Sequence, residues 1–208
     1  MIKISVVIPL YNKERYIKRA VKSVLSQNYQ HFEIIVVNDG STDDGAEQVE
    51  KIEDERIRIT NQENLGESAA RNKGIKKAKY DLIAFLDADD QWEPEFLDNF
   101  ARVMEIYPDA GMIGSAYKII NFKGEMIYPE FAFLSAEEGI IENYFKAALA
   151  RPQICSSAVA IRKEVFDLLG GFTEGMQYGP DNFMWSKIAL SYPVAFINKY
   201  FSYTNSLI

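Results

Sequence analysis

Three aspartates follow an apolar segment in the stretch AFLDADDQWEP, residues 84–94. The carboxylates of Asp87, Asp89 and Asp90 repel one another, and they lose hydration if the segment ends a buried strand. In an extended segment, residues two apart point the same way, so Asp87 and Asp89 can face one ligand together. Carboxylate oxygens suit a hard divalent ion such as Mn²⁺ or Mg²⁺. We therefore predict a metal site at Asp89 and Asp87. The alternative, that Asp89 or Asp90 caps the next helix, explains one carboxylate but not three.

Three further motifs carry groups that suit a nucleotide. Asp39, in VVNDGSTDD, is placed to accept hydrogen bonds from a base or a ribose. Pro9 and Tyr11, in PLYN, are available to pack against a flat ring. Arg71, in ESAARNKG, either reaches a phosphate or pins a carboxylate, unless it is simply a solvated helical arginine.

Alternating strands and helices must position these groups. Apolar, β-branched runs predict strands over residues 4–8, 32–39, 56–60 and 81–86. Helical periodicity predicts helices over 12–27, 41–53 and 67–79, with Asn12 and then Ser41 or Thr42 as N-caps. This order predicts an α/β fold with a mostly parallel sheet and helices on both faces. Ligands of such sheets bind beyond the carboxyl ends of the strands, where the polar motifs lie.

The second half predicts a mixed set of elements that completes the same domain. Helices are expected over residues 94–107, 137–150, 163–171 and 181–192. Strands are expected on both sides of a turn at Gly124, over 156–162, and over 194–204 as one or two closing strands.

Composition excludes several classes of protein. The 208 residues carry 23 basic and 30 acidic side chains, a net charge of −7, which argues against a nucleic-acid groove. The single cysteine, Cys155, forbids an internal disulfide and is expected to be a buried, inert thiol; the single histidine, His31, is expected in an exposed loop.

Because no signal peptide or membrane-length segment is apparent, we expect a cytoplasmic protein that can associate peripherally with the inner face of the membrane. The oligomeric state stays open.

Taken together, these motifs resemble the family 2 glycosyltransferases, the inverting nucleotide-sugar enzymes of the GT-A fold. The matching segments are VVIPLYN, FEIIVVNDGSTD, NLGESAARNKG, DLIAFLDADDQWEP and LLGGFTEG. The resemblance implies a Rossmann-like central sheet with a smaller mixed sheet in the C-terminal half. It also implies one domain over residues 1–208, in which residues 1–92 bind the donor and residues 93–208 bind the acceptor.

The resemblance also assigns roles to the motifs. Asp39 contacts the base of a nucleotide-sugar donor, most simply a UDP-sugar, with Pro9 and Tyr11 beside it and Arg71 on the donor side. Asp87 and Asp89 form the DXD motif that holds Mn²⁺ or Mg²⁺ on the donor diphosphate. The acceptor is a hydroxyl of a glycan or of a lipid-linked sugar.

The general base of such an enzyme is expected in the segment GGFTEGMQYGPDNFMW. Asp181 matches the family's base, although Pro180 replaces the glutamate that usually precedes it; Asp181 as a plain helix cap is the alternative. Acceptor contacts are expected from Trp92, Glu174 and Trp185. The C-terminal region also lacks the histidine that often completes the metal site. The rival interpretation is a non-catalytic module that binds a nucleotide-sugar or a glycan and has a decayed acceptor site.

Overall fold

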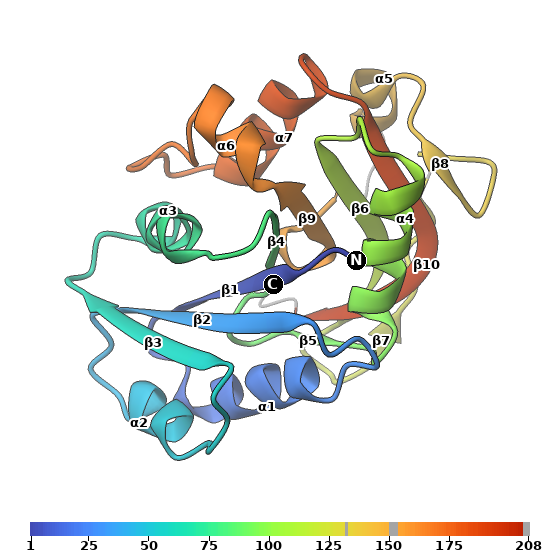
Figure 1. Ribbon diagram of the computed structural model, residues 1–208. Coiled ribbons are helices and arrows are strands. Elements are labelled where there is room, and N and C mark those ends of the chain that lie inside the picture. The colour runs from blue at the N-terminus through green and yellow to red at the C-terminus, as the bar shows by residue number, and fades with distance from the viewer. Residues whose placement is uncertain (132, 150–153, 206–208) are drawn as a thin grey trace.

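The computed structural model describes residues 1–131, 133–149 and 154–205. Within these residues, ten strands form one sheet in the order β3-β2-β1-β4-β9-β6-β10-β5, with β7 paired to β6 and β8 paired to β10. Figure 1 shows helices on both faces of this sheet. The predicted α/β class is therefore confirmed.

The N-terminal half is a parallel sheet. Its strands are β1 (Ile4–Leu10), β2 (Phe32–Asp39), β3 (Ile57–Gln62) and β4 (Leu82–Phe85). Helices α1 (Glu14–Leu25) and α2 (Gly45–Glu50) cover one face, and α3 (Glu67–Lys77) covers the other (Figure 1). Strands β1, β2 and β4 are mostly apolar and buried because both of their faces are covered, whereas the edge strand β3 alternates apolar and polar residues and is half-buried.

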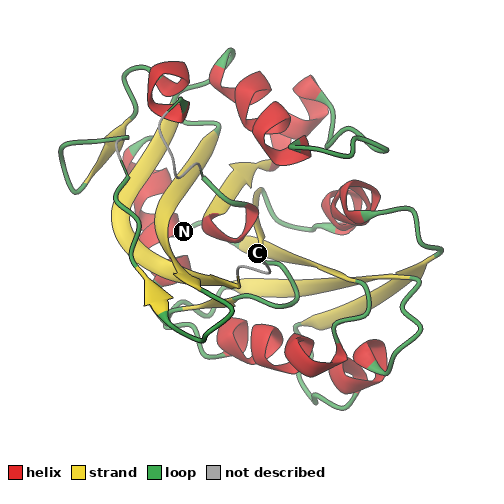
Figure 2. Cartoon of the chain, turned by 180° about the vertical axis from the view of Figure 1, so that it is seen from behind, coloured by secondary structure: helices red, strands yellow, loops and turns green. Residues whose placement is uncertain are grey.

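The C-terminal half extends the same sheet with mixed pairing. Strand β9 (Val159–Arg162) runs antiparallel between β4 and β6 (Met112–Ile120), and β10 (Val194–Asn205) runs parallel to β6. Figure 2 shows from behind how the long, curved strands continue the sheet. The remaining elements are β5 (Gln91–Trp92), β7 (Met126–Ile127), β8 (Glu138–Ile140), α4 (Phe96–Ile106), α5 (Tyr144–Ala148), the 3₁₀ turn η1 (Ser156–Ala158), α6 (Lys163–Leu169) and α7 (Pro180–Ala189). No helix in the described ranges is long and apolar enough to cross a membrane.

The helix predicted over residues 137–150 is wrong. Its first part is the strand β8, which pairs antiparallel with β10 through Glu138, Gly139 and Ile140. Only α5 is helical, and it begins where the Asn143 side chain accepts a hydrogen bond from the Lys146 amide at 2.9 Å. Residue 150 lies outside the described residues. The open edge of β10 outweighs the helical pattern of a segment that contains a glycine.

The predicted helix caps are also wrong. The N-caps are Lys13 for α1 and Asp44 for α2, and the residues expected as caps bond to one another across two loops at the edge of the sheet. Asn12 has a φ of 51°, and its Oδ1 accepts a hydrogen bond from the Thr42 amide at 2.8 Å. The Asn12 amide in turn donates to Ser41 Oγ at 3.2 Å. Helix α1 instead has its first amide, that of Glu14, bonded to Asp43 Oδ2 at 2.9 Å. These residues tie the loops after β1 and β2 to each other, which fixes the edge of the sheet where the polar motifs gather.

Gly74 allows α3 to lie directly on the sheet. A Cβ at this position would lie 2.3 Å from Val7 Cγ1 on β1, and the helix could not keep its place. Although alanine usually favours a helix over glycine by about 1 kcal/mol, we expect Gly74→Ala to destabilise the protein by about 1–3 kcal/mol through overpacking. Urea denaturation measures this free energy of unfolding.

Gly139→Ala is the matched control, because its new Cβ would lie no closer than 3.7 Å to Leu134. This variant should change the free energy of unfolding by less than about 0.5 kcal/mol. A Gly74→Ala protein as stable as the wild type would contradict the close packing of α3 on β1.

Candidate functional site

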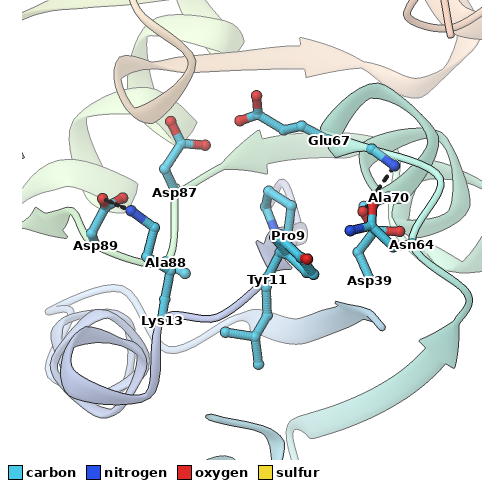
Figure 3. A pocket seen from close by; sticks show the side chains of 12 residues that line it. Pro9, Tyr11, Lys13, Asp39, Asn64, Glu67, Ala70, Asp87, Ala88 and Asp89 are labelled. Carbon is cyan, nitrogen blue, oxygen red and sulfur yellow. Dashed lines mark hydrogen bonds and ion pairs between the residues drawn. The ribbon is translucent and has the colours of Figure 1, made fainter. Parts of the chain in front are cut away.

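A cavity of about 360 Å³ opens at the carboxyl ends of β1, β2 and β4 (Figure 3). Five of the residues expected at the donor lie around it together: Pro9, Tyr11, Asp39, Asp87 and Asp89. The other lining residues are Leu10, Lys13, Asn64, Gly66, Glu67, Ala70 and Ala88. The topology thus brings side chains from three strand ends to one place, as the rule for open α/β sheets predicts.

Asp39 is held rigidly at one end of the cavity. Its Oδ1 accepts hydrogen bonds from Gln62 Nε2 at 2.7 Å and from the Leu65 amide at 2.9 Å. Its Oδ2 accepts from the Gly66 amide at 2.9 Å. A carboxylate has about four acceptor positions, so these three donors fix its orientation and leave capacity for one more. Tyr11 lies in the same cavity, and its side chain is exposed.

The acidic segment after β4 lies at the other end, and its three carboxylates have different environments. Asp89 Oδ2 pairs with Lys13 Nζ at 2.5 Å. Asp87 Oδ2 accepts a hydrogen bond from Ser156 Oγ at 3.0 Å. Asp90 is buried and does not line the cavity. It accepts a hydrogen bond from the Asn205 amide at 2.9 Å, and burial raises its pKa well above the ordinary value.

The capping alternative for these aspartates fails. The N-cap of α4 is Glu95, and no side-chain hydrogen bond caps this helix. Asp89 and Asp90 are instead tied to the end of β10, because Asn205 Nδ2 donates to the Asp89 carbonyl and the Asn205 amide donates to Asp90.

Arg71 is buried behind the cavity, with 1% of its side chain exposed. Its Nη1 lies 2.7 Å from Asp181 Oδ1, and its Nη2 lies 2.9 Å from Asp87 Oδ1. The same Nη2 lies 2.5 Å from Glu67 Oε1 and 2.9 Å from Ser156 Oγ. Of the two roles expected for Arg71, the structure shows the pinning of carboxylates. Arg71 is not among the residues that line the cavity.

This arrangement leaves an excess of negative charge at the site. Burial raises the pKa of Glu67 to about 7, and repulsion from Asp87 adds to the effect while Arg71 opposes it. Burial also raises the pKa of Asp181, and the positive charge of Arg71 again acts to lower it. Two cations, Arg71 and Lys13, pair with four carboxyl groups, those of Glu67, Asp87, Asp89 and Asp181. A further cation would lower the electrostatic energy of the site.

The predicted base, Asp181, is brought to the site from the other half of the chain. It is the second residue of α7, and the N-cap of that helix is Gly179, with no side-chain hydrogen bond to the helix. Asp181 is therefore not a simple cap. Its carboxylate and that of Asp87 share one guanidinium although they are far apart in sequence.

Two of the three acceptor candidates must be corrected. Trp185 is 0% exposed and donates from Nε1 to the Ile154 carbonyl; Trp92 is 4% exposed and donates to the Ser157 carbonyl. Neither indole has surface for a sugar, because each packs in an apolar core. Glu174 is exposed and accepts a hydrogen bond from Asn72 Nδ2 at 2.9 Å.

Several site residues were missed by the sequence analysis. Lys13 follows the PLYN motif directly, and Glu67 begins α3, so both positions at the sheet edge could have been found from the topology. Ser156 and Ser157 support Asp87 from η1, and no pattern in the sequence indicates this. Among the described residues, no group of three or more His, Cys, Asp or Glu forms a ready metal site.

The lone cysteine and histidine lie apart from this chemistry. Cys155 is half-buried rather than fully buried as expected. Its surroundings still raise its pKa well above the ordinary value, chiefly through desolvation, which keeps the thiol neutral. His31 is exposed just ahead of β2, as expected.

Comparison with known proteins decides the family. Residues 5–170 match the family described as glycosyl transferase family 2. The chain belongs to glycosyl transferase family 2. An uncharacterized glycosyltransferase of Rickettsia conorii is 33% identical over 200 residues, which are 95% of this chain and 32% of that protein. Glycosyltransferase GlyG of Streptococcus pneumoniae is 32% identical over 94% of this chain and 68% of its own length.

Solved structures support the fold. Residues 1–349 of S. aureus TarS, in complex with UDP-GlcNAc, superpose with a TM-score of 0.85 over 99% of this chain and 59% of that one, at 23% identity. The UDP complex of the same fragment gives a TM-score of 0.81 at 25% identity, over 98% of this chain and 60% of that one. The fold is the GT-A fold that the sequence predicts. The chain spans about a third of the Rickettsia relative, so its own reaction is taken up below as a proposal.

Removing the charge of Arg71 should be far more damaging than removing that of a surface arginine. We expect Arg71→Met to lower the free energy of unfolding by about 3 kcal/mol, the low end for a broken buried pair, because it leaves the partly exposed carboxylates of Asp87 and Asp181 without their cation. Urea denaturation measures the loss.

Arg102→Met is the matched control. Arg102 pairs with Glu138 but is 44% exposed, so its loss should cost about 0–1 kcal/mol. An equal effect of the two substitutions would contradict the structural role of Arg71.

Proposed function

We propose that this domain transfers a sugar from a UDP-sugar to a hydroxyl group of a glycan or of a lipid-linked acceptor, with inversion at the anomeric carbon. One observation carries the proposal: Arg71 joins Asp87, at the diphosphate end of the cavity, to Asp181, the expected base. A donor site and a base for the acceptor therefore meet at one guanidinium. The UDP-GlcNAc complex of TarS, a protein of the same fold, supports a nucleotide-sugar donor.

The nucleoside end suits a pyrimidine. Asp39 retains capacity for one more hydrogen bond, and the ring N–H of uracil is a donor that a carboxylate can accept. Pro9 and the exposed ring of Tyr11 supply apolar surface for the base and the ribose.

The diphosphate end suits a divalent cation. Asp87 and Asp89 both line the cavity and offer the hard oxygen ligands that Mg²⁺ and Mn²⁺ prefer. Four carboxyl groups share only two protein cations, Arg71 and Lys13, and this excess of negative charge also favours binding of a metal ion. A bound ion would take up charge on the departing diphosphate. Lys13, at the same end, supplies a second positive charge for the phosphates.

Asp181 is proposed as the general base. Arg71 holds its Oδ1 at 2.7 Å and thereby sets the direction in which the carboxylate faces the acceptor hydroxyl. Burial raises the pKa of Asp181, and a carboxylate with a raised pKa takes up a proton more readily. The amino-terminal end of α7 acts in the opposite direction and favours the ionised form that the base must have before it takes the proton. Pro180 occupies the first position of this helix, which suits proline, so the missing glutamate does not disturb the placement of Asp181.

The two halves of the chain then divide the work. Residues 1–92 hold the donor, and residues 93–208 bring the base and the acceptor-side residue Glu174. An acceptor on a lipid would require peripheral association with the inner face of the membrane; nucleic acid is not an expected partner. The rival interpretation, a binding module without catalysis, predicts donor binding without transfer.

The first test is the substitution Asp181→Asn. It keeps the shape of the side chain and an Oδ1 that can still accept the hydrogen bond from Arg71, which also keeps Asp87 and Glu67 as ionic partners. Donor affinity should therefore change little, and the protein should stay folded with a modestly lower melting temperature. Transfer to an acceptor glycan should fall by roughly 10²–10⁴-fold, the usual contribution of a positioned base.

If Asp181→Asn transfers the sugar at the wild-type rate, Asp181 is not the base and another carboxylate must be, with Glu174 the first to test. Donor binding by the wild type without any transfer, tested against a broad acceptor panel, would favour the non-catalytic module.

The metal proposal predicts that Mn²⁺ strengthens donor binding only when Asp89 is intact. Titration calorimetry of a UDP-sugar with and without Mn²⁺ should show a gain for the wild type. Asp89→Asn should abolish this gain, because it removes one of the two ligands. Asp109→Asn, at an exposed position in a loop, is the control and should keep it. Equal affinity of the wild type for the donor in excess chelator would rule the metal out.

A further inference from the structure

Glu67 presents a carboxylate to the cavity and has no part in the function proposed above. It is the first residue of α3, lines the cavity, and has 53% of its side chain exposed. Figure 3 shows its side chain extending toward Asp87 across the top of the cavity. Arg71 holds Oε1, which fixes the carboxylate in place without using all of its acceptor positions.

The transferred sugar must pass close to this carboxylate. The anomeric carbon lies between the diphosphate, which Asp87 and Asp89 serve, and the acceptor hydroxyl, which Asp181 serves. Glu67, Asp87 and Asp181 all pair with the single guanidinium of Arg71, so they surround one small region. A sugar ring attached at that carbon therefore lies within reach of Glu67.

We propose that Glu67 determines the donor sugar: its carboxylate accepts hydrogen bonds from the hydroxyl groups of a neutral sugar and rejects a sugar that carries a carboxylate. This inference rests on the proposed function, since it places the sugar by the donor and the base. Because its pKa is raised to about 7, Glu67 is ionised above neutral pH. There it is a rigid ionic acceptor, which suits vicinal hydroxyl groups that donate short, charge-assisted hydrogen bonds.

The charges around the cavity support the exclusion of acidic sugars. Among the described residues that line the cavity, Lys13 is the one cation, and its Nζ pairs with Asp89. Arg71 is buried and engaged by three carboxyl groups. A uronic acid would therefore meet Glu67 with no protein cation free to pair with it, because the proposed metal ion serves the diphosphate. Like charges at close range are strongly disfavoured.

Equilibrium binding of three probes, UDP, UDP-glucose and UDP-glucuronate, separates the sugar's contribution from that of the nucleotide. Titrations with Mn²⁺ at a pH above 7, where Glu67 is ionised, would use the wild type, Glu67→Gln, Glu67→Asp and the control Glu47→Gln. Glu47 is an exposed residue of α2. Wild type should bind UDP-glucose at least roughly tenfold tighter than UDP-glucuronate. Glu67→Gln should leave the affinity for UDP unchanged and weaken the binding of UDP-glucose by roughly 10- to 100-fold. The ratio of the affinities for UDP-glucose and UDP-glucuronate should therefore become smaller than in the wild type. Glu67→Asp, which keeps the charge, should still reject UDP-glucuronate.

The outcomes separate this inference from the function on which it rests. Wild type that binds no UDP overturns the proposed function itself. Wild type that binds UDP but favours UDP-glucuronate over UDP-glucose overturns the role of Glu67 alone. Glu67→Gln that weakens UDP and UDP-glucose equally, or changes neither, also overturns it. Melting temperatures of the variants show whether each is folded, and Glu67→Asp serves as the test if Glu67→Gln does not fold.

Discussion

The site depends on one buried guanidinium. Arg71 reaches Glu67 on its own helix, Asp87 after β4, Ser156 on η1 and Asp181 on α7. Carboxylates gathered this closely repel one another and lose hydration, and a buried arginine without them would be equally unfavourable. The attraction between Arg71 and the carboxylates therefore offsets the desolvation cost of each group. Because the contacts join four separate elements, the charge network also fixes how the two halves of the chain meet at the cavity.

This network changes how the acidic segment is understood. The sequence alone suggested a metal ion as the compensation for three clustered aspartates. In the structure, Asp89 already pairs with Lys13, Asp87 with Arg71, and Asp90 is tied to the end of β10. The protein thus supplies part of the compensation itself and keeps the carboxylates in place before any ligand arrives. The remaining negative charge is what a divalent ion and its diphosphate would engage.

Local patterns predicted the fold better than they predicted the contacts of the site. The β-branched run over residues 4–8, apolar on both faces, predicts the strand that the structure shows as β1, and the rule for strand ends predicts that Asp39, Asp87 and Asp89 gather at one edge. The helix over 137–150 failed because an open strand edge decided its structure. Burial of Trp185 and the pairing of Arg71 with Asp181 depend on which distant segments meet, and neither composition nor spacing contains that information.

The central claim, that this sheet edge binds a uridine diphosphate with a divalent ion, is tested most directly by the thermal stability of the wild-type protein. Melting temperatures would be measured with UDP, GDP and ADP, each with and without Mn²⁺. A ligand at 100 times its dissociation constant stabilises the native state by about 2.7 kcal/mol, which is readily seen as a shift. We predict that UDP with Mn²⁺ raises the melting temperature more than UDP alone, and more than GDP or ADP with Mn²⁺. A larger shift with GDP or ADP, or no shift with any nucleotide, would contradict the account.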